Sequence, residues 1–573
     1  MRDRETPTAY ATDRVADQVA ETLAAHGVRF AFGMPGGEVV TLIDALAAAG
    51  IAFHLARHET AAAIMAAGAS ATGGGPGLLV TTLGPGLANA VNGIADAAQE
   101  HAPLIVISGV VDRLTRARYT HQVIDHGRIL APLVKGSFEI GAEGAAATVA
   151  RAIRLATTAP MGPVHLDLSP ETAAMQSAEP GAARPARRAA PGIAANDPAV
   201  LALAARLAAA ERPLVLAGFE AARHPGAARI RAFLTAYGAP VVTTYKAKGL
   251  MPEDAPPSLG AAGLSPLADA ELRALADRAD LILLLGYDPI EMRAGWLDAF
   301  GDPARIIALS AAPADHGMHE AGFDLTADIA DLAGALTPGL APRPLWPAGE
   351  PAATRARLDT LFAAPAAWGP HALIETLNAA LEDDAIVTTD SGAHRILLSQ
   401  KWAARRPLHL LQSAGFCTMA TALPLAIGAA VANPGRRVVA VTGDGGLEMG
   451  IGELATLRDL GAAITLVVFQ DRALSLIGLK QAAAGLAPRR VVVLNDTVAS
   501  LLAAAGLLDA QVRVVERECD LRAVVRAREP AEHRRAPCKQ VLPRAAAARA
   551  LRVRLRERRV AQERRFDRTP HFQ

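Results

Sequence analysis

Two aspartates, Asp444 and Asp471, constrain the fold of this chain most, because each follows a short apolar, β-branched run. The runs cover 438–443 and 464–470, and a helical stretch, 447–460, separates them. In a right-handed βαβ unit both strands end at the same edge of a parallel sheet, so the two carboxylates should lie together. The helix opens with Gly-Asp-Gly-Gly, and such helix starts bind phosphate while nearby carboxylates bind Mg²⁺. The pattern predicts a metal–diphosphate site; the alternative is an ordinary glycine turn.

Composition narrows the class of protein. The chain has 573 residues, which is more than one core usually fills, so about three domains are expected. The net charge is +1, which does not favour nucleic acid as a partner. Three cysteines without metal-ligand spacing fit a reducing cytoplasm. The start of the chain has no apolar signal core and no stretch is an uninterrupted membrane span, so we expect a cytoplasmic enzyme without a membrane partner.

Two stretches rich in proline or arginine, 178–198 and about 337–370, divide the chain. The segments between them alternate helical stretches with short apolar strands such as 104–108 and 281–285. That alternation predicts an α/β protein with three parallel sheets flanked by helices. The expected domains are 1–177, 195–337 and 368–512, followed by an atypical arginine-rich segment at 513–573. That last segment is either a basic tail or the product of a shifted reading frame.

The stretch from Asp444 to Asp471 resembles the motif of thiamine diphosphate (ThDP) enzymes, in which Gly-Asp-Gly, a helix and a strand precede Asn or Asp. The resemblance implies that Mg²⁺ is bound by Asp444, Asp471 and the backbone carbonyl of Ala473. The family more often has Asn at the second position, and Asp471 adds a negative charge beside the diphosphate. It also implies three domains in the order pyrimidine-binding, central and diphosphate-binding.

A second part of the resemblance lies near the N-terminus. A predicted strand, 51–56, ends in Arg57-His58-Glu59, and a later strand ends in Gly84-Pro85-Gly86 with Asn89 after it. Both segments are similar to the pyrimidine-binding domain of ThDP enzymes. By this resemblance Glu59 is the glutamate that activates the aminopyrimidine, so that the cofactor supplies most of the chemistry. The alternative is a surface ion pair between Arg57 and Glu59.

Further segments look like those of acetohydroxyacid synthases, among them Met34-Pro-Gly-Gly37 and 415–428. In that family the position of Met419 wedges between the cofactor rings, the carbonyl at Cys417 accepts the amino group, and 389–394 resembles the diphosphate loop. The segment 120–125, with Lys135 after it, resembles one that lies over the thiazolium ring, which makes His121 and Gln122 catalytic candidates. The cofactor-binding residues that the resemblance implies are Gly84, Pro85, Gly86, Asn89, Ser391, Gly392, His394, Cys417, Met419, Gly443, Gly445 and Gly446.

Departures from the acetohydroxyacid synthase pattern fall where the substrate is chosen. Lys480 stands where that family has a tryptophan, and 286–293 lacks the early arginine that holds a substrate carboxylate. We therefore expect Lys480 to bind the anionic substrate as a point charge, with a solvent-facing lysine as the alternative. The central segment also lacks glycine-rich flavin patterns, so no bound FAD is expected, as in carboxyethylarginine synthase and other FAD-free relatives.

Together these features predict a ThDP- and Mg²⁺-dependent lyase or transferase. It would decarboxylate a pyruvate-like 2-oxo acid and transfer the enamine to a second carbonyl, as acetolactate synthase does. The open alternatives are a non-ligating 2-oxo acid decarboxylase, an enzyme of the carboxyethylarginine synthase type and a non-catalytic homologue. The resemblance also implies a homodimer or homotetramer, because in the family the cofactor lies between subunits.

Overall fold

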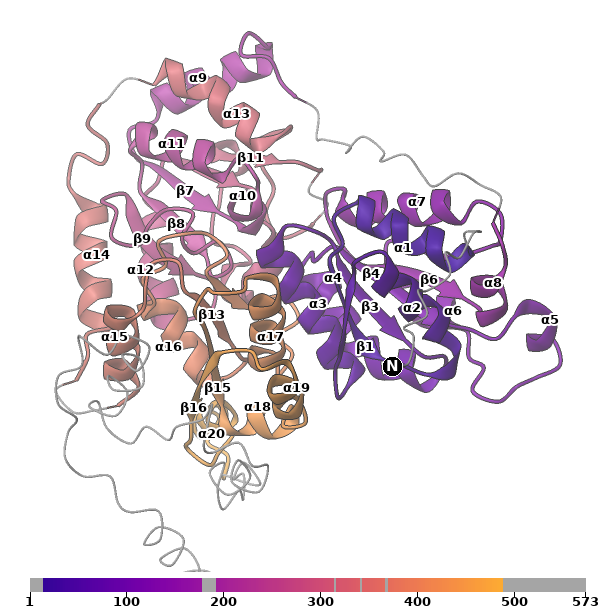
Figure 1. Ribbon diagram of the computed structural model, residues 1–573. Coiled ribbons are helices and arrows are strands. Elements are labelled where there is room, and N and C mark those ends of the chain that lie inside the picture. The colour runs from indigo at the N-terminus through magenta and orange to yellow at the C-terminus, as the bar shows by residue number, and fades with distance from the viewer. Residues whose placement is uncertain (1–13, 178–191, 314–315, 341–342, 366–368, 488–573) are drawn as a thin grey trace, which may run out of the picture. The chain divides into compact units, whose positions relative to one another are not determined.

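Three parallel sheets, each flanked by helices, organise the computed structural model, which describes residues 14–177, 192–313, 316–340, 343–365 and 369–487 (Figure 1). The predicted fold class is therefore confirmed. None of the helices in these ranges combines the length and the apolar composition that crossing a bilayer requires.

The first sheet has the strand order β2-β1-β3-β4-β6-β5, and all of its pairs are parallel. Its strands are β1 (Phe30–Met34), β2 (Ala52–Leu55), β3 (Gly77–Thr81), β4 (Leu104–Gly109), β5 (Ser137–Glu139) and β6 (Val164–Leu168). Its helices are α1 (Val15–Ala25), η1 (Gly37–Val39), α2 (Val40–Ala48), α3 (Glu59–Gly73), α4 (Pro85–Gln99), α5 (Arg113–Arg116), α6 (His126–Leu130), α7 (Ala145–Thr157) and α8 (Pro170–Ala174). Strands β3 and β4 are buried along their whole length, which explains their nearly continuous apolar sequence.

The second sheet has the order β12-β11-β10-β7-β8-β9. Its strands are β7 (Pro213–Ala217), β8 (Val241–Thr244), β9 (Ser258–Ala262), β10 (Leu281–Leu285), β11 (Ile306–Ser310) and β12 (Phe323–Thr326). The longer helices are α9 (Pro198–Ala209), α10 (Phe219–Arg223), α11 (Ala227–Tyr237), α12 (Pro266–Ala276) and α13 (Ile329–Leu336). Single-turn helices are η2 (Pro289–Glu291), η3 (Ala294–Trp296), η4 (Pro303–Arg305) and η5 (Thr337–Gly339). Alternate residues of β10 enter two separate cores, Leu283 one and Leu284 the other, so helices cover both faces.

The third sheet has the order β14-β13-β15-β16. Its strands are β13 (Ile386–Thr389), β14 (Leu410–Gln412), β15 (Val438–Gly443) and β16 (Ile464–Phe469). Its helices are α15 (Pro370–Ala380), α16 (Ala393–Lys401), α17 (Ala422–Ala432), α18 (Asp444–Met449), α19 (Glu453–Leu460) and α20 (Ser475–Ala483). The strand β15 pairs in parallel with both β13 and β16, so the residues that follow these strands share one edge of the sheet.

Two expectations from the sequence need correction. The helical stretch 447–460 is not one helix but two, α18 and α19, because Gly450 and Gly452 interrupt it. The stretch 337–370, read as a linker, contains helix α14 (Glu350–Leu361). Trp346 is buried there and donates a hydrogen bond from Nε1 to the carbonyl oxygen of Pro213 at 2.8 Å. The prolines that suggested a linker instead flank segments that pack against the central sheet.

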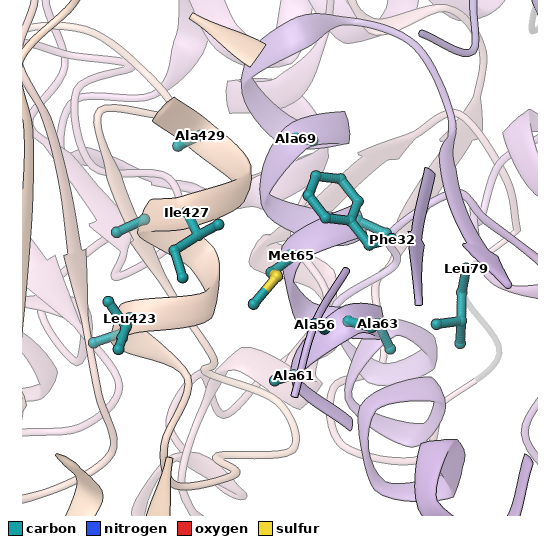
Figure 2. Packing of buried hydrophobic residues seen from close by; sticks show 14 of the residues in the cluster. Phe32, Ala56, Ala61, Ala63, Met65, Ala69, Leu79, Leu423, Ile427 and Ala429 are labelled. Atoms are coloured by element: carbon teal, nitrogen blue, oxygen red, sulfur yellow. The ribbon is translucent and has the colours of Figure 1, made fainter. Parts of the chain in front are cut away.

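Helices α3 and α17 cross closely and share one hydrophobic core (Figure 2). Glycines make the approach possible: a Cβ added to Gly68 would lie 2.6 Å from the carbonyl oxygen of Leu425, and one added to Gly428 would lie 2.0 Å from that of Met65. Figure 2 shows Met65 of α3 facing Ile427 of α17. This contact joins the two elements that begin next to the candidate site residues of the first and third sheets.

Candidate functional site

Asp444 and Asp471 lie at the carboxyl ends of β15 and β16, as the sequence predicted. Gly443 and Phe469, the last residues of these strands, are paired in the sheet. The backbone N–H of Arg472 donates to Oδ2 of Asp444 at 2.7 Å, which brings the two aspartate-bearing turns together. Asp444 is buried and Asp471 is exposed. Burial raises the pKa of Asp444, and the negative charges of Asp471 and Glu448 raise this pKa further.

The turn after β16 has the conformation of a ligand loop. Arg472 has a positive φ of 59°, and the N–H of Ala473 donates to Oδ1 of Asp471 at 3.1 Å. The hydroxyl of Ser475 donates to the other carboxylate oxygen of Asp471. The turn therefore holds Asp471, Ala473 and Asp444 in one small region. Two carboxylates and a backbone carbonyl are hard oxygen ligands, the type that Mg²⁺ prefers.

Within the part of the chain that the structure describes, three buried polar groups near the end of β13 have no hydrogen-bond partner. They are the hydroxyls of Thr389 and Ser391 and Nε2 of His394. The His394 ring stacks on Phe469 with centroids 5.7 Å apart, and a Cβ added to Gly443 would lie 3.4 Å from this ring. Burial lowers the pKa of His394 to about 4, so the ring is neutral at physiological pH. Hydroxyls and a neutral imidazole can all donate to phosphate, so these groups fit a diphosphate beside the two aspartates.

Asp390 is a residue of this edge that was not among the predicted site residues. It is buried and accepts hydrogen bonds from the N–H groups of Ser391 at 2.7 Å and Ala420 at 3.0 Å, and from the hydroxyl of Thr442 at 3.0 Å. Burial raises its pKa, and these hydrogen bonds lower it. The carboxylate thus fixes the turn that follows Met419 to the third sheet. Its place after the apolar strand 386–389 was the available signal in the sequence.

The loop before α17 has a strained backbone. Cys417 and Ala420 have φ values of 57° and 65°, which non-glycine residues rarely adopt. Arg293, from the second sheet's part of the chain, donates from its guanidinium to Sγ of Cys417 at 2.9 Å. Met419 is partly exposed in the same loop. The segment 286–293 lacks the family's early arginine, and no sequence pattern indicated that Arg293, at its end, reaches this loop.

Glu59 lies at the first position of α3 and is 4% exposed. Asn89, on the second turn of α4, donates from Nδ2 to Oε2 of Glu59 at 3.1 Å. A Cβ added to Gly86 would lie 3.4 Å from Oε1 of the same carboxylate. Glu59, Gly86 and Asn89 therefore form one cluster, in which the carboxylate pairs with an amide. In the structure Arg57 is instead paired with Asp459, so a surface ion pair between Arg57 and Glu59 is not formed.

The remaining predicted residues have different surroundings. His121 is exposed and packs edge-on against Tyr119, with ring centroids 6.1 Å apart. Gln122 has a φ of 59°, and its carbonyl lies so close to Gly84 that a Cβ there would be 2.3 Å from this oxygen. Lys480 is exposed on α20. Gln122 thus joins the glycine turn near Glu59, whereas His121 and Lys480 face solvent.

Lys135 contacts backbone carbonyl oxygens of the loop before β6. Its ammonium group donates to the carbonyl oxygens of Thr158 at 2.6 Å and Pro160 at 2.7 Å. Burial lowers its pKa to about 8. These contacts give Lys135 a structural role in the loop before β6.

Models of three protein families match successive parts of the chain. They are described as thiamine pyrophosphate enzyme, N-terminal TPP binding domain, over residues 13–129; central domain, over 200–336; and C-terminal TPP binding domain, over 390–535. Thiamine pyrophosphate is another name for ThDP. The chain belongs to the thiamine pyrophosphate enzyme family. The cluster around Glu59 lies in the N-terminal TPP binding domain, and the aspartate pair lies in the C-terminal one.

Acetolactate synthases are among the relatives of this thiamine pyrophosphate enzyme. It is 31% identical to the acetolactate synthase of Bacillus subtilis (strain 168) over 483 residues, which are 82% of this chain and 83% of the relative. It is 31% identical to the acetolactate synthase isozyme 1 large subunit of Escherichia coli (strain K12) over 482 residues, 81% of this chain and 83% of the relative. It is 33% identical to the acetolactate synthase large subunit of Parasynechococcus marenigrum (strain WH8102) over 482 residues, which are 80% of this chain and 76% of the relative.

Proposed function

We propose that this thiamine pyrophosphate enzyme decarboxylates a pyruvate-like 2-oxo acid and transfers the remaining two-carbon unit to a second carbonyl. This is the type of reaction that the name of its relatives, acetolactate synthase, indicates. One observation carries the proposal most. The N-terminal TPP binding domain contains the buried Glu59–Asn89 pair. The C-terminal one contains the two aspartates, beside buried polar groups that are available to donate hydrogen bonds to a phosphate. Similarity to acetolactate synthases over most of the chain supports the reaction class.

The residues of this chain would share the work as follows. Asp444, Asp471 and the carbonyl of Ala473 would hold Mg²⁺, and Ser391 and His394 would bind the diphosphate. Bound ThDP supplies a carbon nucleophile and an electron sink for the loss of CO₂. Glu59 would hold or release a proton at the aminopyrimidine, and Asn89 orients its carboxylate.

The substrate carboxylate needs a cation, and two are candidates. Lys480 is exposed on α20, and Arg293 contacts the Cys417 loop. We propose Lys480 as the anion anchor because the family's early arginine is missing from 286–293. Lys480→Met should then raise the Michaelis constant for the 2-oxo acid, and Arg293→Met serves as the comparison. An unchanged Michaelis constant in Lys480→Met, with a raised one in Arg293→Met, would transfer the role to Arg293.

The experiment that tests the function is pyruvate consumption by the purified protein with ThDP and Mg²⁺, while acetolactate, acetaldehyde and CO₂ are followed together. Acetolactate with matching CO₂ supports the proposal, and acetaldehyde with CO₂ indicates a simple decarboxylase. Product formed only when an amine acceptor is added would indicate an enzyme of the carboxyethylarginine synthase type. Calorimetric titration with ThDP tests the alternative that the chain is a non-catalytic homologue, because a homologue that does not bind the cofactor would show no heat of binding.

Two properties of the assembly complete the proposal. We propose a homodimer or a pair of homodimers, which sedimentation equilibrium would distinguish. We also propose that activity needs no FAD, because the central segments 216–220 and 260–264 lack the glycine-rich flavin pattern. The purified, active protein should then show no flavin absorption, and activity that rises on adding FAD would contradict this.

A further inference from the structure

A buried histidine, His126, links the glycine turn near Glu59 to strand β6. Its Nδ1 lies 2.7 Å from Oδ1 of Asp167, which is on β6, and the backbone N–H of Gly84 donates to its Nε2 at 3.2 Å. Because an N–H donates to Nε2, this nitrogen carries the lone pair, and the ring proton is on Nδ1. His126 therefore donates to Asp167 and accepts from Gly84, which fixes one tautomer and one ring orientation.

Gly84 is a position where such a link matters. It has a φ of 51°, and a Cβ there would lie 2.3 Å from the carbonyl oxygen of Gln122, so the turn is crowded and has little freedom to adjust. The carbonyl of Gly84 accepts from the N–H of Ala88 at 2.9 Å, which forms the first turn of α4. Asn89 follows directly and donates to Glu59. Fixing the N–H of Gly84 thus fixes the start of the helix that orients Glu59.

The same residues offer a rival interpretation as a metal site. Ligand atoms of His126, His165 and Asp167 all lie within 4.8 Å of one another. However, a metal on Nδ1 of His126 would move the ring proton to Nε2, where it would face the N–H of Gly84. Nδ1 of His165 already lies 2.7 Å from the hydroxyl of Ser137. The observed hydrogen bond from Gly84 therefore favours a hydrogen-bonded relay over a metal.

We propose that His126 and Asp167 are a positioning pair, which holds the Gly84 turn and, through α4, the Asn89–Glu59 pair in the geometry that binds the aminopyrimidine of ThDP. This inference rests on the proposed function for its cofactor. The hydrogen bonds themselves belong to the protein without cofactor. They can therefore be tested separately.

Two substitutions of His126 separate the two hydrogen bonds. In His126→Asn the amide nitrogen can take the place of Nδ1 and donate to Asp167, but nothing reaches Gly84. In His126→Gln the amide oxygen can take the place of Nε2 and accept from Gly84. Hydrogen–deuterium exchange of the cofactor-free protein should show that the amide of Gly84 is protected in the wild type. Protection should be lost in His126→Asn and largely kept in His126→Gln.

Cofactor affinity provides the second readout. Calorimetric titration with ThDP and Mg²⁺ should give an affinity about tenfold weaker for His126→Asn, the value of one lost hydrogen bond, and a loss of about threefold or less for His126→Gln. A role in general stability would lower the melting temperature of both variants without separating their affinities. The Asn and Gln variants are similar in polarity, so each is the control for the other.

Three results would overturn the inference. The first is an unprotected Gly84 amide in the wild-type protein, which needs no variant to fold. The second is equal exchange and equal ThDP affinity in the two variants. The third is stoichiometric binding of Zn²⁺ by the wild type that both variants lose, which would establish the metal site instead. A wild type that binds no ThDP would refute the proposed function, while the exchange data would still decide the bond between His126 and Gly84.

Discussion

The backbone N–H of Arg57 donates to both carboxylate oxygens of Glu453, at 3.0 and 3.2 Å. Arg57 lies two residues before Glu59, and Glu453 begins α19, the helix that follows the aspartate-bearing α18. Glu453 is buried and also accepts from the hydroxyl of Thr456 at 2.7 Å. This buried carboxylate therefore ties the turn that carries the proposed activating glutamate to the domain that carries the proposed metal ligands.

Glu453→Ala should destabilise the protein by about 1–3 kcal/mol, because it leaves the N–H of Arg57 without an acceptor. Glu453→Gln should cost less, since an amide oxygen still accepts one bond. The control is Asp459→Asn, which changes the more exposed ion pair with Arg57 and should leave the free energy of unfolding nearly unchanged. Urea unfolding at fixed protein concentration measures all three. Equal costs for Glu453→Ala and Asp459→Asn would contradict the role assigned to Glu453.

Glu59→Gln should lower turnover at least 100-fold, because the amide cannot exchange a proton with the aminopyrimidine. The amide oxygen still accepts from Asn89, so the affinity for ThDP should stay within about fivefold of the wild type. Turnover is measured as CO₂ release, and affinity by calorimetry. Glu171→Gln, which changes an exposed carboxylate at the start of α8, is the control and should leave both unchanged. Turnover of Glu59→Gln close to that of the wild type would exclude Glu59 as the activating group.

Asp471→Asn should leave Mg²⁺ binding within about fivefold of the wild type, because the amide oxygen remains a ligand and the charge that raises the pKa of Asp444 is removed. Asp471→Ala removes the ligand and should weaken Mg²⁺ binding by 10- to 100-fold or more, roughly the range known for disturbed metal sites. The measurement is Mg²⁺-dependent binding of ThDP. If both variants bind Mg²⁺ equally well, Asp471 is not a ligand.

Local sequence was sufficient for the parallel sheets and for the two aspartates. The alternation of apolar strands and helices predicted parallel sheets. The handedness of a βαβ unit then predicted that Asp444 and Asp471 lie at one sheet edge, without any knowledge of side-chain packing. The helix between them was predicted too long because apolar spacing dominated the assignment, although Gly450 and Gly452 are present in the sequence. The helix α14 was missed because the prolines at 338, 342, 344, 347 and 351, most of which precede the helix, were taken as linker signals.

Contacts between distant segments could not be predicted in this way. No sequence pattern marks Glu453 as important, because its partner Arg57 lies in another domain. Asp390 and His126 likewise act through backbone N–H groups of other loops, and such partners depend on how the loops pack. The carbonyl oxygens that Lys135 contacts could not be predicted either, because only the folded loop brings them near. A family motif identifies ligand residues, whereas the residues that hold them in place become visible only in the structure.

Gly428→Ala should destabilise the protein by about 1–3 kcal/mol or more, because the new Cβ would lie 2.0 Å from the carbonyl oxygen of Met65 and would push α17 away from α3. The matched control is Gly37→Ala, where no atom lies within 4 Å of the added Cβ, and its effect should be within about 0.5 kcal/mol. Thermal unfolding of both variants compares them directly. Equal melting temperatures would show that the two helices do not cross as closely as described.

His409 should make stability fall as the solution becomes acidic. Partial burial lowers the pKa of His409 to about 4 in the folded protein, and the positive charges of Arg436 and Arg406 act in the same direction. The hydrogen bond to the Asp383 carbonyl and the charge of Asp384 oppose this shift. The unfolded chain, with an ordinary histidine pKa near 6.5, binds more protons between these two values. The contribution of His409 to stability is therefore fully present above about pH 6.5 and is lost as the pH falls toward 4.

His409→Asn removes this titration, so its unfolding free energy should depend less steeply on pH than that of the wild type. The comparison belongs between about pH 5 and 6.5, where most carboxylates stay ionised in both states. The variant also loses the hydrogen bond between Nε2 of His409 and Arg436, 2.9 Å in the structure, which shifts the whole curve downward without changing its slope. Urea unfolding at several pH values separates the two effects. A slope in His409→Asn equal to that of the wild type would mean that His409 is protonated alike in the folded and unfolded states, contrary to its partly buried position near two arginines.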